Sequence, residues 1–170
     1  YMTPVGVTSR TFDVNTFWAQ HTDRVQEHLA RGLDCLESLP YVDKQRIGAV
    51  GFSLGGYFML VIGARGNVKA VVSYYGAYHG RPVSSVPTQH PLSDYTVQMR
   101  APVLMFHGDA DSTVPISRAQ AVQNLLSTAG KQSDLVVYPG VEHEFDKVGR
   151  PFYNATVTAD AQARTLAFLA

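Results

Sequence analysis

Cysteine, charge and long apolar runs are all scarce in this sequence. The single cysteine, Cys35, excludes an internal disulfide and a site held by several cysteines, and we expect it to be a small buried residue. The longest apolar run, residues 58–64, is far shorter than the roughly 20 residues that cross a bilayer, so no membrane span is predicted. Only 16% of the residues are charged, and 14 Lys and Arg balance 14 Asp and Glu. Without an excess of basic charge, nucleic acid and anionic membranes are excluded as main partners.

The sequence does contain enough apolar material for a packed core. Its 170 residues are 45% hydrophobic and 11% aromatic, which excludes disorder and predicts one globular domain over residues 1–170. Because the chain begins at Tyr1 rather than at methionine, we expect it to be processed, trimmed or a fragment. The sequence lacks the paired cysteines that are typical of small secreted proteins, and we expect a cytoplasmic location.

Apolar residues recur with two different patterns along the chain. Between residues 15 and 39 they are spaced as in an amphipathic helix, and Pro40 ends this segment. Short runs rich in Val then alternate with further helical segments. We predict strands at residues 46–52, 68–74, 103–107 and 135–138, and helices at residues 15–39, 54–65, 117–129 and 158–169. This alternation predicts an α/β fold, with a mostly parallel sheet flanked by helices.

One connection, residues 75–101, is longer than most loops and carries three prolines. Loops of this length are usually functional or disordered, so we expect residues 75–92 to border the mouth of an active site and residues 93–99 to form a short helix. Tyr75 and Tyr78 lie at the start of this connection. We expect them to pack at the strand end; the alternative is that they line the rim of an acyl or aromatic pocket.

The segment GFSLGG, residues 51–56, falls between a predicted buried strand and a predicted helix. A serine at such a turn sits in strained backbone with its hydroxyl projected outward, and the flanking glycines allow the tight reversal. Ser53 is therefore a candidate nucleophile, and the backbone N–H of Leu54 would face an oxyanion formed on the attacked carbonyl. The alternative interpretation is a glycine-rich turn with a capping serine.

A serine nucleophile needs a base, normally a histidine that is oriented by a carboxylate. Of the six histidines, His143 is the best candidate because it follows the strand at residues 135–138. Loops that leave the carboxyl ends of parallel strands gather the sites of open α/β sheets. We expect His107, which ends a strand, to have a structural role beside the site.

Two carboxylates, Asp109 and Asp111, follow the strand at residues 103–107 and could orient the histidine. Each alone could equally be a turn or capping aspartate. Their position between Ser53 and His143 agrees with the order nucleophile, acid, histidine of α/β-hydrolases.

Together the segments GFSLGG, HGDADSTVP and PGVEHEF make residues 15–169 resemble the dienelactone hydrolase family of α/β-hydrolases. The resemblance implies that Asp111, rather than Asp109, is the triad acid and that His143 is the base. Ser53 departs from the family pattern, because dienelactone hydrolases proper carry cysteine at this position, and serine resembles their esterase-like relatives.

A second departure from the family is the short region ahead of Ser53, where several strands are expected and none is recognised. The fold should therefore be an amino-terminally truncated α/β-hydrolase. The family draws its second oxyanion donor from this region, so only the Leu54 N–H is assigned. An uncovered sheet edge favours association between copies of the chain, and we expect a homo-oligomer.

These features predict a serine hydrolase that cleaves small carboxylic esters or lactones and needs neither cofactor nor metal. One alternative is a non-catalytic, truncated hydrolase-like domain that binds a ligand. Another is an acyltransferase or peptidase with the same triad, because the first half-reaction is shared.

Overall fold

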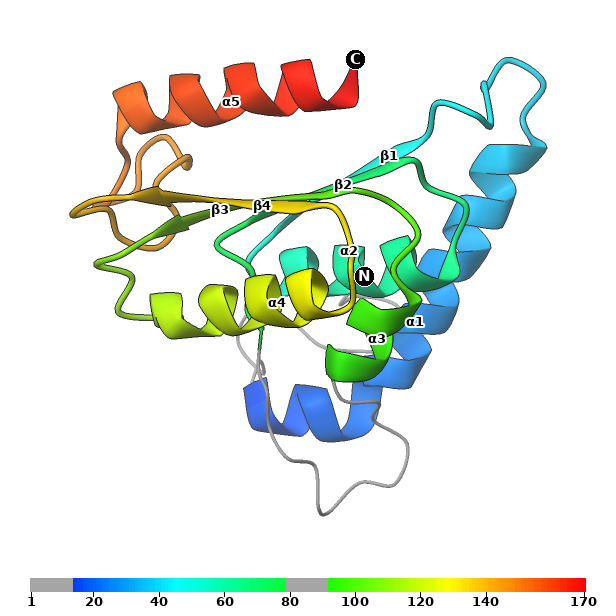
Figure 1. The fold of residues 1–170 in the computed structure, drawn as a ribbon, viewed down its shortest axis with the longest axis horizontal. Helices are drawn as coiled ribbons and strands as arrows, with labels where there is room; N and C mark the ends of the chain where they lie inside the picture. Colours follow the sequence, from blue (N-terminus) through cyan, green and yellow to red (C-terminus); the bar gives the residue numbers. More distant parts are fainter. Residues whose placement is uncertain (1–13, 79–91) are drawn as a thin grey trace.

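The computed structural model describes residues 14–78 and 92–170. Over these ranges the elements are α1 (Val14–Ser38), β1 (Gly48–Phe52), α2 (Leu54–Arg65), β2 (Ala70–Tyr74), α3 (Leu92–Gln98), β3 (Val103–Gly108), α4 (Ile116–Thr128), β4 (Ser133–Tyr138) and α5 (Ala155–Leu169). The predicted alternation of strands and helices is confirmed (Figure 1). Of the predicted active-site mouth at residues 75–92, residues 79–91 lie outside the described ranges.

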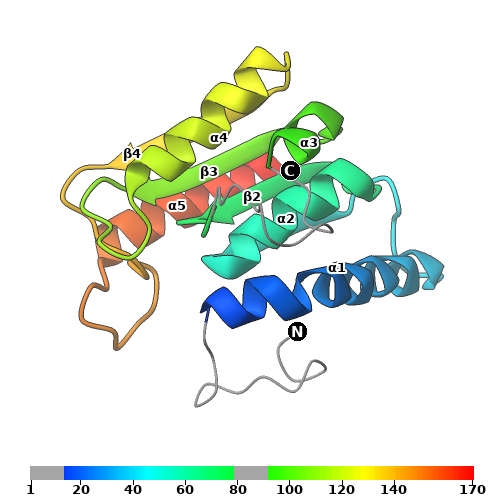
Figure 2. The same cartoon turned by 90° about the horizontal axis from the view of Figure 1, so that it is seen from below.

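The sheet is parallel, and its strands lie in chain order, β1-β2-β3-β4. Helices α2, α3 and α4 connect successive strands and lie on one face of the sheet, whereas α5 covers the other (Figure 1). The arrangement follows from the right-handed preference of β-α-β units, because strands added in one direction place every crossover on the same face. Helix α1 packs beside α2 (Figure 2).

The middle of the sheet is buried on both faces. Every residue of β2 and β3 is buried, and alternate side chains enter two separate cores. Val71 and Met105 belong to the core shared with α2, while Val72 and Phe106 belong to the core beneath α5. This two-sided burial is why these strands consist mostly of apolar residues, with Ser73 and His107 as polar exceptions.

Strand β1 forms an edge of this sheet. Within the described residues it pairs only with β2, and no strand precedes it. Val50 and Phe52 share the face of Val72 and Tyr74 but are 38% and 42% exposed. Among residues 14–78 and 92–170, the edge therefore presents apolar side chains beside backbone groups that pair with no further strand.

Two expectations are corrected by the structure. Helix α5 begins at Ala155, ahead of the predicted residue 158, because the side chain of Asn154 accepts a hydrogen bond from the Val157 N–H and caps the helix. Cys35 is exposed on α1 rather than buried. Across residues 14–78 and 92–170, no helix has both the length and the apolar character needed to cross a membrane.

Candidate active site

Ser53 occupies a sharp turn between β1 and α2. Its φ of 51° and ψ of −119° are strained for a residue with a side chain. The turn is held to β2, because the Ser53 N–H donates to the Tyr74 carbonyl at 2.9 Å and the Ser53 carbonyl accepts from the Ala77 N–H at 2.8 Å. At Gly51, a Cβ would collide with the carbonyl group of Gly55, so only glycine fits.

The structure brings Ser53, His143 and Asp111 together in one line of hydrogen bonds. His143 Nε2 lies 3.0 Å from Ser53 Oγ, and His143 Nδ1 lies 2.7 Å from Asp111 Oδ2. His143 is 7% exposed and Asp111 is 5% exposed. Since an ionised carboxylate can only accept, the proton of the neutral imidazole is on Nδ1, which leaves Nε2 to accept from the serine hydroxyl.

Asp111 is held in its ionised form by the donors around it. The N–H groups of Thr113 and Val114 donate to Oδ1 at 2.9 and 2.7 Å. Burial alone would raise the pKa of Asp111, but hydrogen bonds from His107, His143 and the Val114 N–H bring it well below its ordinary value. The carboxylate is therefore a fixed negative charge beside the histidine.

His107 contacts the same carboxylate oxygen of Asp111 as His143 does. Its Nε2 is 2.8 Å from the Val114 carbonyl and 3.3 Å from Asp111 Oδ2. A carbonyl only accepts, so Nε2 carries the proton, and the buried Nδ1 has no hydrogen-bond partner among the described residues. This position fits the structural role that the sequence suggested.

Asp109, the competing acid, points elsewhere. Its Oδ1 accepts the Gly140 N–H at 2.6 Å, which ties the loop after β3 to the turn after β4. Glu142 adds a second tie, because its Oε2 accepts the N–H and hydroxyl of Ser112 at 2.9 and 3.0 Å. The hydrogen bond from the Ser112 N–H lowers the pKa of Glu142. These bonds fix the two loops that carry the acid and the base.

The two tyrosines considered as rim residues are buried instead. The Tyr75 ring packs against the His143 ring, and its hydroxyl donates to Asp146. The Tyr78 hydroxyl donates to Ser73 Oγ at 2.6 Å. This burial agrees with the expected packing role, and Tyr78 also lines a cavity together with residues of α3 and α4. The sequence does not predict the contact of Tyr75 with His143, because no local motif joins residues so distant in sequence.

Leu54 is the first residue of α2, so its N–H is one of the unpaired donors at the helix start. A donor there is suited to a developing oxyanion on a carbonyl attacked by Ser53. In the part of the chain that the structure describes, no group of three or more His, Cys, Asp or Glu residues is placed to hold a metal ion.

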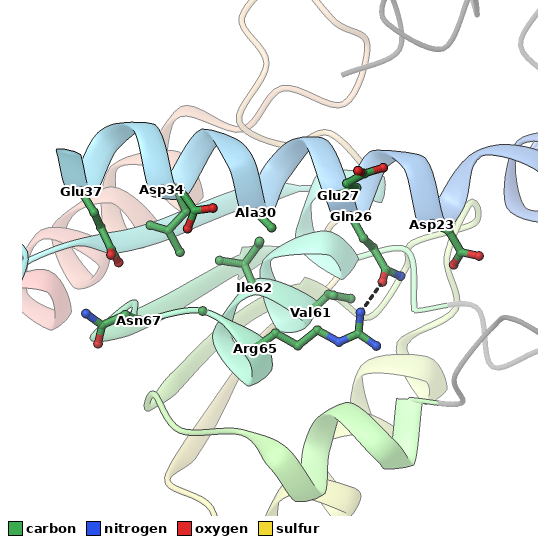
Figure 3. A pocket seen from close by; sticks show the side chains of 12 residues that line it. Asp23, Gln26, Glu27, Ala30, Asp34, Glu37, Val61, Ile62, Arg65 and Asn67 are labelled. Atoms are coloured by element: carbon green, nitrogen blue, oxygen red, sulfur yellow. Dashed lines mark hydrogen bonds between the residues drawn. The ribbon is translucent and has the colours of Figure 1, made fainter. Parts of the chain in front are cut away.

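A cleft of about 780 Å³ lies between α1 and α2 (Figure 3). Its lining includes the carboxylates of Asp23, Glu27, Asp34 and Glu37 and the guanidinium of Arg65. Gln26 accepts a hydrogen bond from Arg65 at 3.0 Å (Figure 3). The lining contains no serine, cysteine or histidine, and Arg65 lies at the opposite end of α2 from Ser53. The candidate nucleophile and base, Ser53 and His143, therefore lie outside this cleft.

The chain is similar to known proteins of one family. A family model described as "Dienelactone hydrolase family" matches residues 8–170. A "Putative carboxymethylenebutenolidase" from Synechocystis sp. is 30% identical over 125 residues, which are 74% of this chain and 50% of that protein. A protein of the same name from Methylorubrum extorquens is 34% identical over 123 residues, or 72% of this chain and 42% of that protein. The chain thus spans half or less of the length of these two relatives.

Two further matches are a solved structure with a similar fold and a protein that is named as a peptidase. The solved structure of a "Putative Dienelactone Hydrolase" from Klebsiella pneumoniae has a TM-score of 0.78 and 27% identity, covering 94% of this chain and 68% of that one. An "Uncharacterized peptidase YuxL" from Bacillus subtilis is 26% identical and covers 66% of this chain and 20% of that protein. The similarity in structure confirms the α/β-hydrolase fold.

Proposed function

Because the chain belongs to the dienelactone hydrolase family, we propose that it is a serine hydrolase that cleaves carboxylic esters or lactones. Membership of the family supports hydrolase activity. The observation that carries the finer proposal is the pair of hydrogen bonds that joins Ser53 to His143 and His143 to Asp111. A serine, an imidazole and a buried carboxylate in this order are the parts that nucleophilic acyl transfer requires.

In the first half-reaction, Ser53 Oγ attacks the carbonyl carbon while His143 Nε2 takes the hydroxyl proton. The negative charge that forms on the carbonyl oxygen faces the Leu54 N–H. Collapse of this intermediate breaks the bond to the leaving alcohol, which receives the proton from His143. An acyl group then remains on Ser53.

In the second half-reaction, water replaces the alcohol as the nucleophile. His143 removes a proton from the water, the hydroxide attacks the acyl carbon, and the proton returns to Ser53 Oγ as the acid leaves. Asp111 stays ionised throughout and stabilises the imidazolium that forms twice in each cycle. A small ester or lactone is the substrate in this proposal.

The same triad could release an amine instead of an alcohol, so peptide cleavage is a second candidate. Its support is the similarity to the Bacillus subtilis protein named as a peptidase. Transfer of the acyl group to an amine or alcohol would share the first half-reaction. A cytoplasmic location remains part of the proposal, supported by the single cysteine.

The proposal is tested with a fluorophosphonate probe, which labels activated serines. We expect labelling of the wild type, none of Ser53→Ala, and unchanged labelling of the control Ser127→Ala, an exposed serine on α4. Equal labelling of Ser53→Ala would overturn the assignment of the nucleophile.

A panel of p-nitrophenyl esters, lactones and peptide p-nitroanilides then separates the substrate classes. Fastest turnover of the esters or lactones supports the proposal, and fastest turnover of the anilides supports the peptidase. A folded protein that turns over none of them, yet is stabilised against heat by one, would instead be a binding domain.

A further inference from the structure

Tyr75 directly follows β2, in a backbone conformation that tyrosine rarely adopts. Its φ is 37°, and its N–H donates to the Phe106 carbonyl of β3 at 2.7 Å. The side chain is 0% exposed. Positive φ in a bulky residue costs on the order of 1 kcal/mol or more and persists only where the surroundings enforce it.

The described residues contain two other non-glycine residues with positive φ, Ser53 at 51° and Glu144 at 59°. Ser53 is the proposed nucleophile, and Glu144 directly follows the proposed base. Tyr75 contacts that base, so all three strained positions meet at one place. Backbone strain of this kind gathers at functional sites.

The side chain of Tyr75 contacts three residues of the turn after β4, His143, Phe145 and Asp146. Its ring centroid lies 4.6 Å from that of His143, with the planes at 60°. A second ring contact, at 5.3 Å and 78°, joins it to Phe145. The hydroxyl donates to the carboxylate of Asp146. Tyr75 thus contacts the imidazole itself and the residues that follow it.

We propose that Tyr75 is a positioning residue for His143, holding the imidazole in line with Ser53 through its ring contact and its hydrogen bond to Asp146. This inference rests on the proposed function, because it assigns a role within the same triad. Asp111 and Ser53 each hold one imidazole nitrogen, and these two hydrogen bonds leave the ring free to tilt about the line through the two nitrogens. The Tyr75 ring limits that tilt, and Asp146 fastens the turn from which His143 projects.

The hydroxyl of Tyr75 is suited to this task because it stays a donor. Burial raises the pKa of the Tyr75 phenol, and the neighbouring Asp146 carboxylate raises it further. The bond to Asp146 therefore persists over the neutral and mildly alkaline range in which a histidine base is active.

The neighbouring tyrosine provides a matched control. Tyr74 is also buried, and its hydroxyl forms a 2.7 Å hydrogen bond with Thr165 of α5. Its ring contacts Phe52, Phe106, Phe145 and Tyr75 but is not paired with His143 in the described structure. Tyr74→Phe and Tyr75→Phe each remove one phenol hydroxyl from a buried ring, and only the second loosens the histidine.

The test measures kcat and KM for p-nitrophenyl acetate, together with the thermal midpoint, in wild type, Tyr75→Phe, Tyr74→Phe and Asp146→Ala. We expect Tyr75→Phe and Asp146→Ala each to lower kcat about tenfold and to leave KM within about twofold, because a small misplacement of the base slows the chemical step. The double variant should lose little more than either single one, since both remove the same bond. Tyr74→Phe should lower the midpoint and leave kcat unchanged.

Equal kcat in Tyr75→Phe and Tyr74→Phe would overturn the inference, as would additive losses in the double variant. If Tyr75→Phe does not fold, Asp146→Ala decides by the same comparison of kcat with KM. Failure of the proposed function has a different signature, because the wild type itself would then neither turn over the ester nor be labelled at Ser53.

Discussion

His143 Nε2 lies 3.0 Å from Ser53 Oγ, although the two residues are 90 positions apart and follow opposite edge strands of the sheet. Neighbouring strands are about 4.8 Å apart, so β4 is roughly 14 Å from β1. The turn after β4 must therefore run back across the carboxyl ends of β3 and β2. Asp111 follows β3 and Tyr75 follows β2, and each contacts His143. Both strands that the turn crosses thus help to place the imidazole.

The two aspartates after β3 should differ sharply in their effect on catalysis. Asp111→Asn should lower kcat about a thousandfold or more, because an amide can present its N–H to His143 and stabilise the wrong tautomer. Asp109→Asn should stay near wild type, since its side-chain oxygen can still accept the Gly140 N–H. Rates with p-nitrophenyl acetate check both changes, and similar losses in the two variants would contradict the assignment.

Stability should fall in acid through Asp111. Its pKa is lowered in the folded state and near 3.9 when unfolded, so the unfolded chain binds the proton more readily. The stabilisation is therefore present above about pH 4 to 5 and is lost as the pH falls toward the folded pKa. The midpoint of wild type minus that of Asp111→Asn, followed from pH 7 to pH 3, should be constant at first and then shrink. A difference that grows toward low pH would contradict this sign.

Glycines 51 and 55 should respond oppositely to alanine. At Gly51 a Cβ would strike the backbone of Gly55, so Gly51→Ala should lower the free energy of unfolding by about 1–3 kcal/mol or more. At Gly55 nothing lies within 4 Å of the added Cβ, and the residue is helical, so Gly55→Ala should be neutral or stabilising by up to about 1 kcal/mol. Urea denaturation measures both values. Equal losses in the free energy of unfolding for the two variants would contradict this prediction.

The edge of β1 predicts association between copies of the chain. Val50 and Phe52 are partly exposed, and in the described part of the chain the outer edge of β1 pairs with no strand, a combination that favours pairing with another strand. Size-exclusion chromatography at micromolar concentration should show a species larger than the monomer. Val50→Lys places a charge on this edge and should shift the elution to the monomer. A monomeric wild type at that concentration would count against the prediction.

Much of the fold could be predicted because its signals are local. Residues 103–106 of β3 are all apolar since both faces of the strand are covered, and the glycine-rich turn at Ser53 is dictated by the backbone angles it needs. The start of α5 at Ala155 is hard to predict although its cap, Asn154, is also local, because a capping asparagine within a loop resembles any other turn residue.

The sequence by itself determined the α/β alternation, the strained serine turn and the candidate acid and base at strand ends. Only the tertiary structure decided which of these groups meet. It directed Asp111 to His143 and Asp109 to Gly140, and it buried Tyr75 against the imidazole. The physical reason is that a turn or a strand depends on near neighbours in the chain, whereas the contacts at the site depend on the order and spacing of strands in the sheet.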